Sequence, residues 1–152
     1  METPVLSDAH FMKEALKEAQ KASDAGEVPV GAVVVCRGRI IARAHNMTEK
    51  LRDVTAHAEM IALTSAANHL GSKYLPECTL YVSLEPCLMC AAALRWAQLG
   101  QLVYGASDPK EGFTTHDRPV LHKKTTVVSG ILAEEAGTML TDFFRKRRAL
   151  NT

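Results

Sequence analysis

The chain has 152 residues, 47% of them hydrophobic and 23% charged, and its 18 basic and 17 acidic side chains give a net charge of +1. This length suits one globular domain, expected over residues 1–152, and the composition excludes an intrinsically disordered chain. No apolar run reaches the roughly 18 residues of a membrane span, and the start METPVLSDAH lacks the basic and apolar regions of a secretory signal. We therefore expect a cytoplasmic protein without a membrane segment, in which closely spaced cysteines serve metal binding or catalysis.

Apolar residues recur at helical spacing in some segments and form short continuous runs, typical of buried strands, in others. Thr55 is the expected N-cap of the second helix, and Pro86 is expected in the first turn of the third, where proline is tolerated. Met89 and Trp96 lie among alanines and leucines of that third helix and are predicted core residues. In chain order the expected elements are a helix at 8–25, strands at 30–35 and 40–42, a helix at 55–70, a strand at 79–82, a helix at 86–98, strands at 102–104 and 125–128, and a helix at 131–148.

This alternation of strands and helices predicts a three-layer α/β/α fold with a central sheet of about five strands. Residues 106–124 form a polar stretch without periodicity, and loops of this length are commonly functional. Four of the 18 basic residues stand together at 145–148, so the rest of the chain carries a net charge of −3. This basic block is interpreted either as a solvated helix end that complements the helix dipole or as a nucleic-acid contact.

Two short motifs carry the candidate chemistry. His57 and Glu59 form H-x-E near the start of the second expected helix, and Cys87 and Cys90 form P-C-x-x-C near the start of the third. Cysteines three residues apart share one face of a helix, and the helix N-terminus favours their thiolates. Together with a neutral imidazole they supply three ligands, which with water in the fourth position describe a catalytic zinc site. The sequence therefore predicts one zinc ion per chain.

Each motif alone has another interpretation. A single C-x-x-C is equally typical of a redox pair, and a histidine in an alanine-rich helix is more often a packed or surface residue. A structural zinc would need a fourth protein ligand; Cys36 and Cys78 could supply one, although their positions in a hairpin turn and just before a strand give no ligand spacing. The combination of H-x-E with P-C-x-x-C favours a zinc deaminase, in which the glutamate is the general acid and base and does not bind the metal.

Beyond these motifs, the sequence resembles the cytidine deaminase-like superfamily and, within it, the bacterial tRNA wobble-adenosine deaminases. The resemblance implies a cytidine deaminase-like fold, the metal ligands His57, Cys87 and Cys90, and Glu59 as proton shuttle. It also implies hydrolytic deamination of adenosine to inosine at the wobble position of tRNA, with the anticodon arm as partner, and a homodimer. It spans roughly residues 8–148 and rests on GEVPVGAV (26–33), TAHAEM (55–60), LYVSLEPCLMCA (80–91) and DFFR (142–145).

Four residues are expected to contact the substrate. The resemblance assigns a base contact to Asn46 and a nucleic-acid contact to Asp108, and Ala58 and Pro86 are expected beside the metal. Three of them have a plainer interpretation: asparagine after a strand and aspartate before proline are ordinary turn residues, and proline can simply begin a helix.

The long loop departs from the pattern of the tRNA enzymes. Residues 113–124 look shorter than the corresponding segment and do not end near N-H-R. Guanine or cytosine deaminases of the same superfamily keep the zinc site without a tRNA surface. The alternative function is therefore deamination of a free nucleobase or nucleoside, such as guanine, cytosine or cytidine; the loop favours it, and the basic block favours RNA.

Overall fold

The computed structural model describes residues 6–151. The other residues of the domain expected over 1–152, which include the first five residues of the start METPVLSDAH, lie outside the described part. The observed order agrees with the expected alternation, with the addition of a short helix and a 3-10 turn. The elements are α1 (Asp8–Asp24), β1 (Gly31–Cys36), β2 (Arg39–His45), α2 (Thr48–Leu51), α3 (Ala58–Leu70), β3 (Cys78–Leu84), α4 (Leu88–Trp96), β4 (Gln101–Ala106), the 3-10 turn η1 (Phe113–Thr115), β5 (Thr126–Val128) and α5 (Ala133–Leu150).

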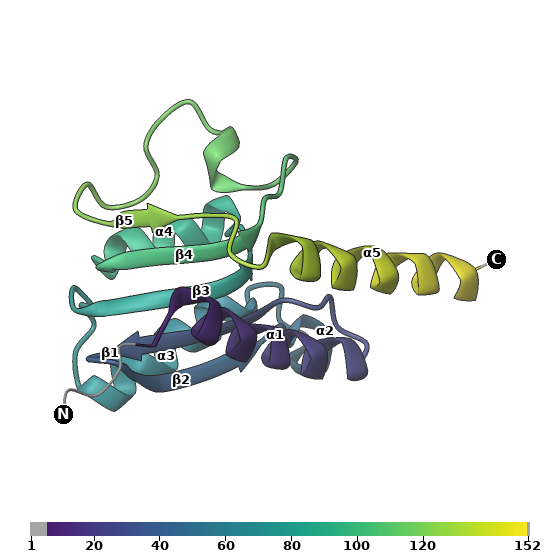
Figure 1. Cartoon of the computed structure of the whole chain (residues 1–152), viewed down its shortest axis with the longest axis horizontal. Helices are drawn as coiled ribbons and strands as arrows, with labels where there is room; N and C mark the ends of the chain where they lie inside the picture. The colour runs from purple at the N-terminus through teal and green to yellow at the C-terminus, as the bar shows by residue number, and fades with distance from the viewer. Residues whose placement is uncertain (1–5, 152) are drawn as a thin grey trace.

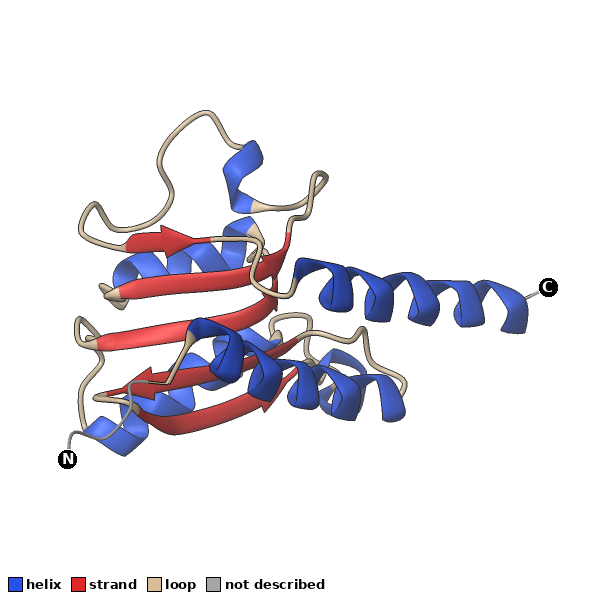
Figure 2. Ribbon diagram, viewed as in Figure 1, coloured by secondary structure: helices blue, strands red, loops and turns tan. Residues whose placement is uncertain are grey.

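The strands form one sheet in the order β2-β1-β3-β4-β5 between two layers of helices. Helices α1 and α5 lie on one face, and α3 and α4 lie on the other (Figures 1 and 2). Each face has its own apolar cluster: Phe11 and Met12 of α1 pack on one side of the sheet, whereas Ala62 of α3 and Leu94 of α4 pack on the other. The predicted three-layer α/β/α fold with five strands is thereby confirmed.

The direction of the strands determines where the loops meet. β1 runs antiparallel to both β2 and β3, whereas β3, β4 and β5 run parallel to one another. The carboxyl ends of these three parallel strands therefore share one edge of the sheet. The segment after Leu84, the loop after Ala106 and the start of α5 all leave the sheet at this edge.

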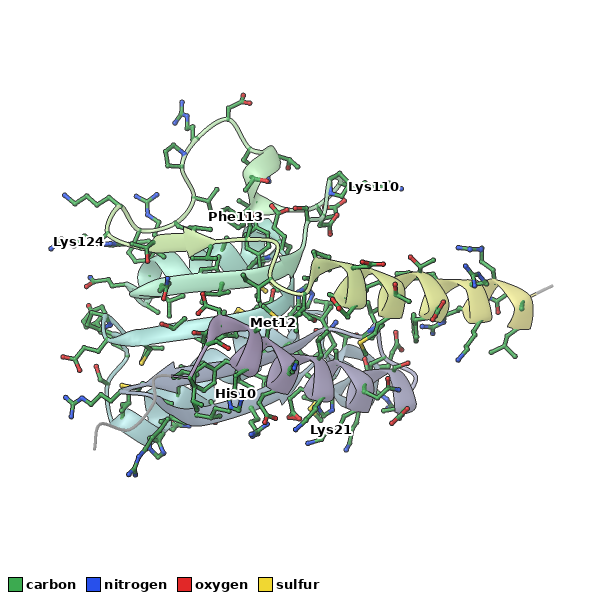
Figure 3. The ribbon with its side chains drawn as sticks, viewed as in Figure 1. His10, Met12, Lys21, Lys110, Phe113 and Lys124 are labelled. Carbon is green, nitrogen blue, oxygen red and sulfur yellow. The ribbon has the colours of Figure 1, made fainter. Side chains whose placement is uncertain are left out.

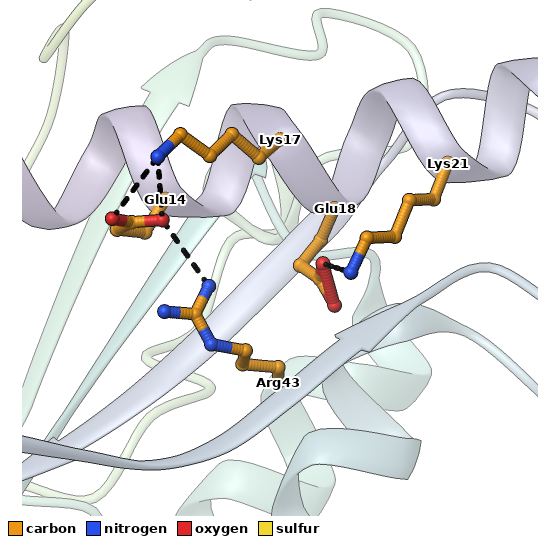
Figure 4. Close-up of polar contacts among 5 residues, drawn as sticks. All are labelled: Glu14, Lys17, Glu18, Lys21 and Arg43. Atoms are coloured by element: carbon orange, nitrogen blue, oxygen red, sulfur yellow. Dashed lines mark hydrogen bonds and ion pairs between the residues drawn. The ribbon is translucent and has the colours of Figure 1, made fainter.

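Helix α1 packs unusually close to the sheet because Gly31 has no side chain. A Cβ atom at Gly31 would lie 2.1 Å from the carbonyl oxygen of Ala15, which no real Cβ contact tolerates. Polar pairs hold the outer side of the same helix (Figure 4): Arg43 of β2 reaches Glu14 at 3.2 Å, and Lys21 covers the buried Glu18 at 2.7 Å.

Two predicted helix starts are wrong by a few residues. The N-cap of α3 is His57, and the Thr55 hydroxyl instead donates to Asp53 at 2.7 Å within the preceding turn. Pro86 lies before the N-cap of α4, which is Cys87, and so is not in its first turn. In both places the N-cap residue has an extended backbone, so each helix begins a few residues later than apolar periodicity indicates.

The prediction that Trp96 belongs to the core is also wrong, because its side chain is 78% exposed. Helix α4 buries Cys90, Ala91 and Leu94 against the sheet. Trp96 follows Leu94 by two positions, about 200° around the helix, and therefore faces away from the sheet. Met89 is only half-buried.

The long loop between β4 and β5 is irregular apart from η1, as predicted. Phe113 anchors it, because its buried ring meets Tyr104 edge-on with 6.1 Å between centroids. Lys110 and Lys124, near the two ends of the loop, point outward (Figure 3). Within residues 6–151, no helix combines the length and apolar character needed to cross a membrane.

Candidate metal centre

Three predicted metal ligands converge where α3 and α4 begin. His57 is the N-cap of α3, Cys87 is the N-cap of α4, and Cys90 lies one turn further along α4. The His57 Nδ1 atom lies 3.7 Å from Cys87 Sγ and 3.5 Å from Cys90 Sγ. Among the residues 6–151, this is the only group of three or more histidine, cysteine or acidic side chains whose ligand atoms all lie within 4.8 Å of one another.

The spacing of these atoms fits a tetrahedral zinc ion. Zinc–sulfur and zinc–nitrogen bonds of ordinary length place a sulfur and a nitrogen ligand about 3.6 Å apart across a tetrahedral angle. The two nitrogen–sulfur distances, 3.7 and 3.5 Å, agree with that value. Cys36 of β1 and Cys78 of β3 lie opposite each other in the strand register, at the end of the sheet away from this site, and both are free thiols. Neither therefore supplies a fourth ligand. The donor set is therefore that of a catalytic metal site, which keeps one position open.

The two cysteines of the site influence each other's protonation. A hydrogen bond from Cys90, together with one from His57 and against the opposing effect of burial, lowers the pKa of Cys87 to about 4. The same contact between the sulfurs raises the pKa of Cys90, as does its burial. Without a metal, the pair therefore holds one proton, which a divalent cation would displace on binding.

Glu59 lies beside the three candidate ligands but is not a member of their cluster. Its side chain is only 5% exposed, and this burial raises its pKa to about 7, with a further contribution from the negative charge of Cys87. A carboxyl group with a pKa near neutrality can both accept and donate a proton at physiological pH. The position and the environment of Glu59 therefore suit a proton shuttle.

A cavity of about 420 Å³ opens beside these residues, large enough for a small ligand. It brings together most of the predicted site residues, whereas Ala58, Pro86 and Cys90 are buried and do not line it. The lining residues are Val28, Val30, Asn46, Thr48, His57, Glu59, Leu84, Glu85, Cys87, Asp108 and Glu111.

The predicted substrate contacts also have structural partners within the chain. The Asn46 amide donates to the Val28 carbonyl at 3.1 Å, and its oxygen accepts from the Ala58 backbone N–H at 2.8 Å. The Asp108 carboxylate accepts from the backbone N–H groups of Lys110 and Glu111. Both side chains thus shape the loops around the cavity, as turn residues do, while they line it.

Two buried acidic residues near the cavity were not identified from the sequence as site residues. Glu27 accepts hydrogen bonds from the Thr48 hydroxyl and from the backbone N–H groups of Glu49 and Lys50. Burial alone would raise the pKa of Glu27, but these hydrogen bonds hold it below its usual value. Glu85 is buried in a comparable way. The available signal was an acidic residue beside an apolar run, in GEVPV and VSLEP, where an unpaired charge would be costly.

The chain is similar to several known deaminases. The sequence profile of the MafB19-like deaminase family matches residues 6–148. A tRNA-specific adenosine deaminase from Bacillus subtilis is 48% identical over 146 residues, which cover 93% of this chain and 91% of that protein. The solved structure of a tRNA:A34 deaminase, studied for A-to-I editing at the wobble position, superposes with a TM-score of 0.81 at 46% identity and covers 86% of this chain and 99% of its own.

A more distant solved structure is that of a guanine deaminase from Nitrosomonas europaea. It superposes with a TM-score of 0.79 at 26% identity, and the match covers 93% of this chain and 87% of that one. The architecture is therefore shared with an enzyme named for a free base, but the sequence similarity is much greater to the enzymes named for tRNA.

The convergent ligands predict the metal content of variants. We expect about one divalent ion per chain in the wild type, and loss of most of it in Cys87→Ala and Cys90→Ala, because two remaining ligands hold zinc poorly. Elemental analysis of freshly purified protein measures this content. Cys36→Ala removes a buried cysteine outside the site and is the matched control. Full metal content in both site variants would contradict the assignment.

Proposed function

Because this chain belongs to the MafB19-like deaminase family and is a relative of the tRNA-specific adenosine deaminases, we propose that it converts adenosine to inosine at the wobble position of tRNA. The observation that carries the proposal is the convergence of His57, Cys87 and Cys90 beside the buried Glu59 in one cavity. We further propose one zinc ion per chain, a single deaminase domain over residues 1–152, and action in the cytoplasm, where the site cysteines remain reduced.

In this proposal the metal and Glu59 divide the chemistry. Zinc, when bound, would supply the Lewis acidity that makes water nucleophilic near neutral pH. The Glu59 carboxylate accepts one proton of the attacking water and gives it to the ring nitrogen of the base. It then takes the proton of the newly added hydroxyl group and gives it to the departing amine as the carbonyl forms. Ammonia rather than an amide anion then leaves. Asn46, Ala58, Pro86 and Asp108 are proposed to shape or contact the site that holds the base.

Deamination of a free base is the second candidate, since the guanine deaminase shares the fold. The greater sequence identity to the tRNA enzymes favours RNA. Incubation with an anticodon stem-loop that carries adenosine, and separately with free adenine, guanine, cytosine and cytidine, distinguishes the two when ammonia and product are measured.

Helix α5 supports an RNA substrate through its charge and its direction. It begins at the edge of the sheet where the parallel strands end, and its last turns extend past the rest of the molecule (Figure 1). The basic block at 145–148 lies on these last turns and is exposed. We propose that it contacts phosphates of the anticodon arm.

We also propose that the chain is a homodimer, as the sequence resemblance implies, and that the exposed side of α4 belongs to the pairing surface. On this helix Trp96 is 78% exposed and Leu88 is 44% exposed. Trp96 lies beside a surface cavity that is also lined by Tyr74 and Val120. A second copy would bury these apolar side chains, which gives Trp96 the apolar environment that it lacks in one chain.

Glu59→Gln tests the proton shuttle. The amide keeps the shape of the side chain but cannot accept a proton, so we expect activity on the stem-loop to fall by about 10²–10⁴-fold. Zinc content should remain near one per chain, because Glu59 is not a ligand. Single-turnover rates and elemental analysis on the same preparation measure both quantities, and an unimpaired variant would refute the role of Glu59.

Neutralising Arg145, Lys146, Arg147 and Arg148 tests the phosphate contact. We expect weaker binding to RNA of any sequence and a flatter dependence on salt, each lost contact reducing the log–log slope by roughly 0.7–0.9. RNA affinity at several salt concentrations measures this slope. Neutral replacements of Arg37 and Arg39, on the hairpin at the opposite edge of the sheet, are the control. Superimposable slopes for the wild type and the quadruple variant would contradict the proposed contact.

Trp96→Glu tests the dimer, because a buried charge at the pairing surface should separate the subunits. Light scattering at micromolar concentration should give twice 16.6 kDa for the wild type and a mass near 16.6 kDa for the variant. Val54→Glu changes another exposed apolar residue, 85% exposed and not on α4, and should leave the dimer intact. A wild-type mass near that of one chain would overturn the proposal.

A further inference from the structure

Glu85 carries a carboxylate that the proposed chemistry does not use. It precedes the Pro86-Cys87 segment, lines the cavity, and is only 3% exposed. Burying a carboxylate is costly unless hydrogen-bond donors or cations replace water around it. Within residues 6–151, no lysine or arginine forms an ion pair with it.

Three donors from the long loop replace water at this carboxylate. The Asp108 backbone N–H donates to Oε1 at 3.0 Å, and the Thr114 backbone N–H donates to Oε2 at 3.0 Å. The Thr114 hydroxyl donates to the same oxygen at 2.8 Å. One side chain thus binds both ends of the segment 108–114.

The backbone of this segment also follows the backbone that precedes α4. Phe113 N–H donates to the Pro86 carbonyl at 2.9 Å, and Cys87 forms a β-bridge with Gly112. Gly112 permits this approach, since a Cβ there would lie 2.2 Å from Oε2 of Glu85 and 2.5 Å from the Asp108 carbonyl oxygen. A side chain at position 112 would therefore overlap the Glu85 carboxylate.

The segment held in this way forms one wall of the cavity. Asp108 and Glu111 line it together with His57, Glu59 and Cys87. Asp108 also closes a compact turn through the N–H groups of Lys110 and Glu111. The position of this turn relative to the metal ligands thus depends on the hydrogen bonds at Glu85.

We propose that Glu85 is a positioning residue that holds the segment 108–114 against the Pro86-Cys87 backbone and so preforms the wall of the cavity that receives the target nucleotide. This inference rests on the proposed function for its substrate. Because Glu85 acts through the loop, its loss should weaken substrate binding more than the chemical step. A preformed wall avoids the cost of ordering the loop each time RNA binds.

Glu85→Gln tests the proposal, because a glutamine offers one acceptor oxygen where two are needed. Its NH₂ group would face an N–H donor of either Asp108 or Thr114, which leaves that donor unsatisfied. We expect amide exchange at Asp108 and Thr114 to accelerate roughly tenfold or more, the loss expected for a hydrogen bond to a charged group. The KM for the stem-loop should rise by a similar factor, with kcat and zinc content near those of the wild type.

Thr114 supplies a second, milder test, since its side chain lies at the surface. Thr114→Val removes the hydroxyl donor and should shift exchange and KM in the same direction by less, whereas Thr114→Ser keeps the donor and should restore both. This pair decides the question if Glu85→Gln does not fold. Glu18→Gln is the matched control: it neutralises a buried carboxylate on α1, and the segment 108–114 should be unaffected.

Exchange rates at 108–114 that are unchanged in both Glu85→Gln and Thr114→Val would overturn the proposal. So would faster exchange throughout the protein with loss of zinc, which indicates a purely structural role. The exchange measurement, by amide-resolved NMR on the zinc-loaded protein, needs no substrate. A wild type that is inactive on RNA would therefore contradict the proposed function while the exchange data still decide whether Glu85 holds the loop.

Discussion

The site depends on two helices, α3 and α4, that begin close together. The side chains of their N-cap residues point to a shared cluster and do not cap the helices. His57 and Cys87 are both N-caps in extended conformation, and neither side chain caps its own helix. The exposed N–H groups of a helix start favour negative charge, which suits the thiolate of Cys87. The parallel strands deliver the α4 start to the edge where α3 begins, so the ligand atoms meet without any long side chain.

Around this point, buried carboxylates hold backbone rather than cations. Glu27 receives N–H groups and a hydroxyl from the start of α2, and Glu85 receives them from the loop after β4. Both segments border the cavity, through Thr48 and Asp108. Acidic side chains are effective here because a carboxylate offers only acceptors, whereas loop backbones near a ligand have N–H groups to satisfy.

Much of this organisation could be predicted from the sequence, because apolar periodicity and closely spaced ligands are local signals. The main helices, the strands, and His57, Glu59, Cys87 and Cys90 belong to this class. The exposed side of α4 could not be predicted, because both sides of this helix are apolar in sequence. Only the structure shows that the sheet covers one side of α4 and that nothing in the described chain buries Trp96 on the other. Helix α2 is too short for a periodic pattern, and the partners of Glu85 lie more than twenty positions away in the chain.

The mixed direction of the strands also determines how far apart in the sequence the paired residues lie. The hairpin of β1 and β2 joins residues close in sequence, so contacts of short range can form it early. The parallel pairs require closure of the α4 crossover and of the long loop, which costs more entropy than closure of the hairpin. A chain emerging from the ribosome presents His57 well before Cys90, so the three side chains of the proposed metal site are all available only after the start of α4 has been made.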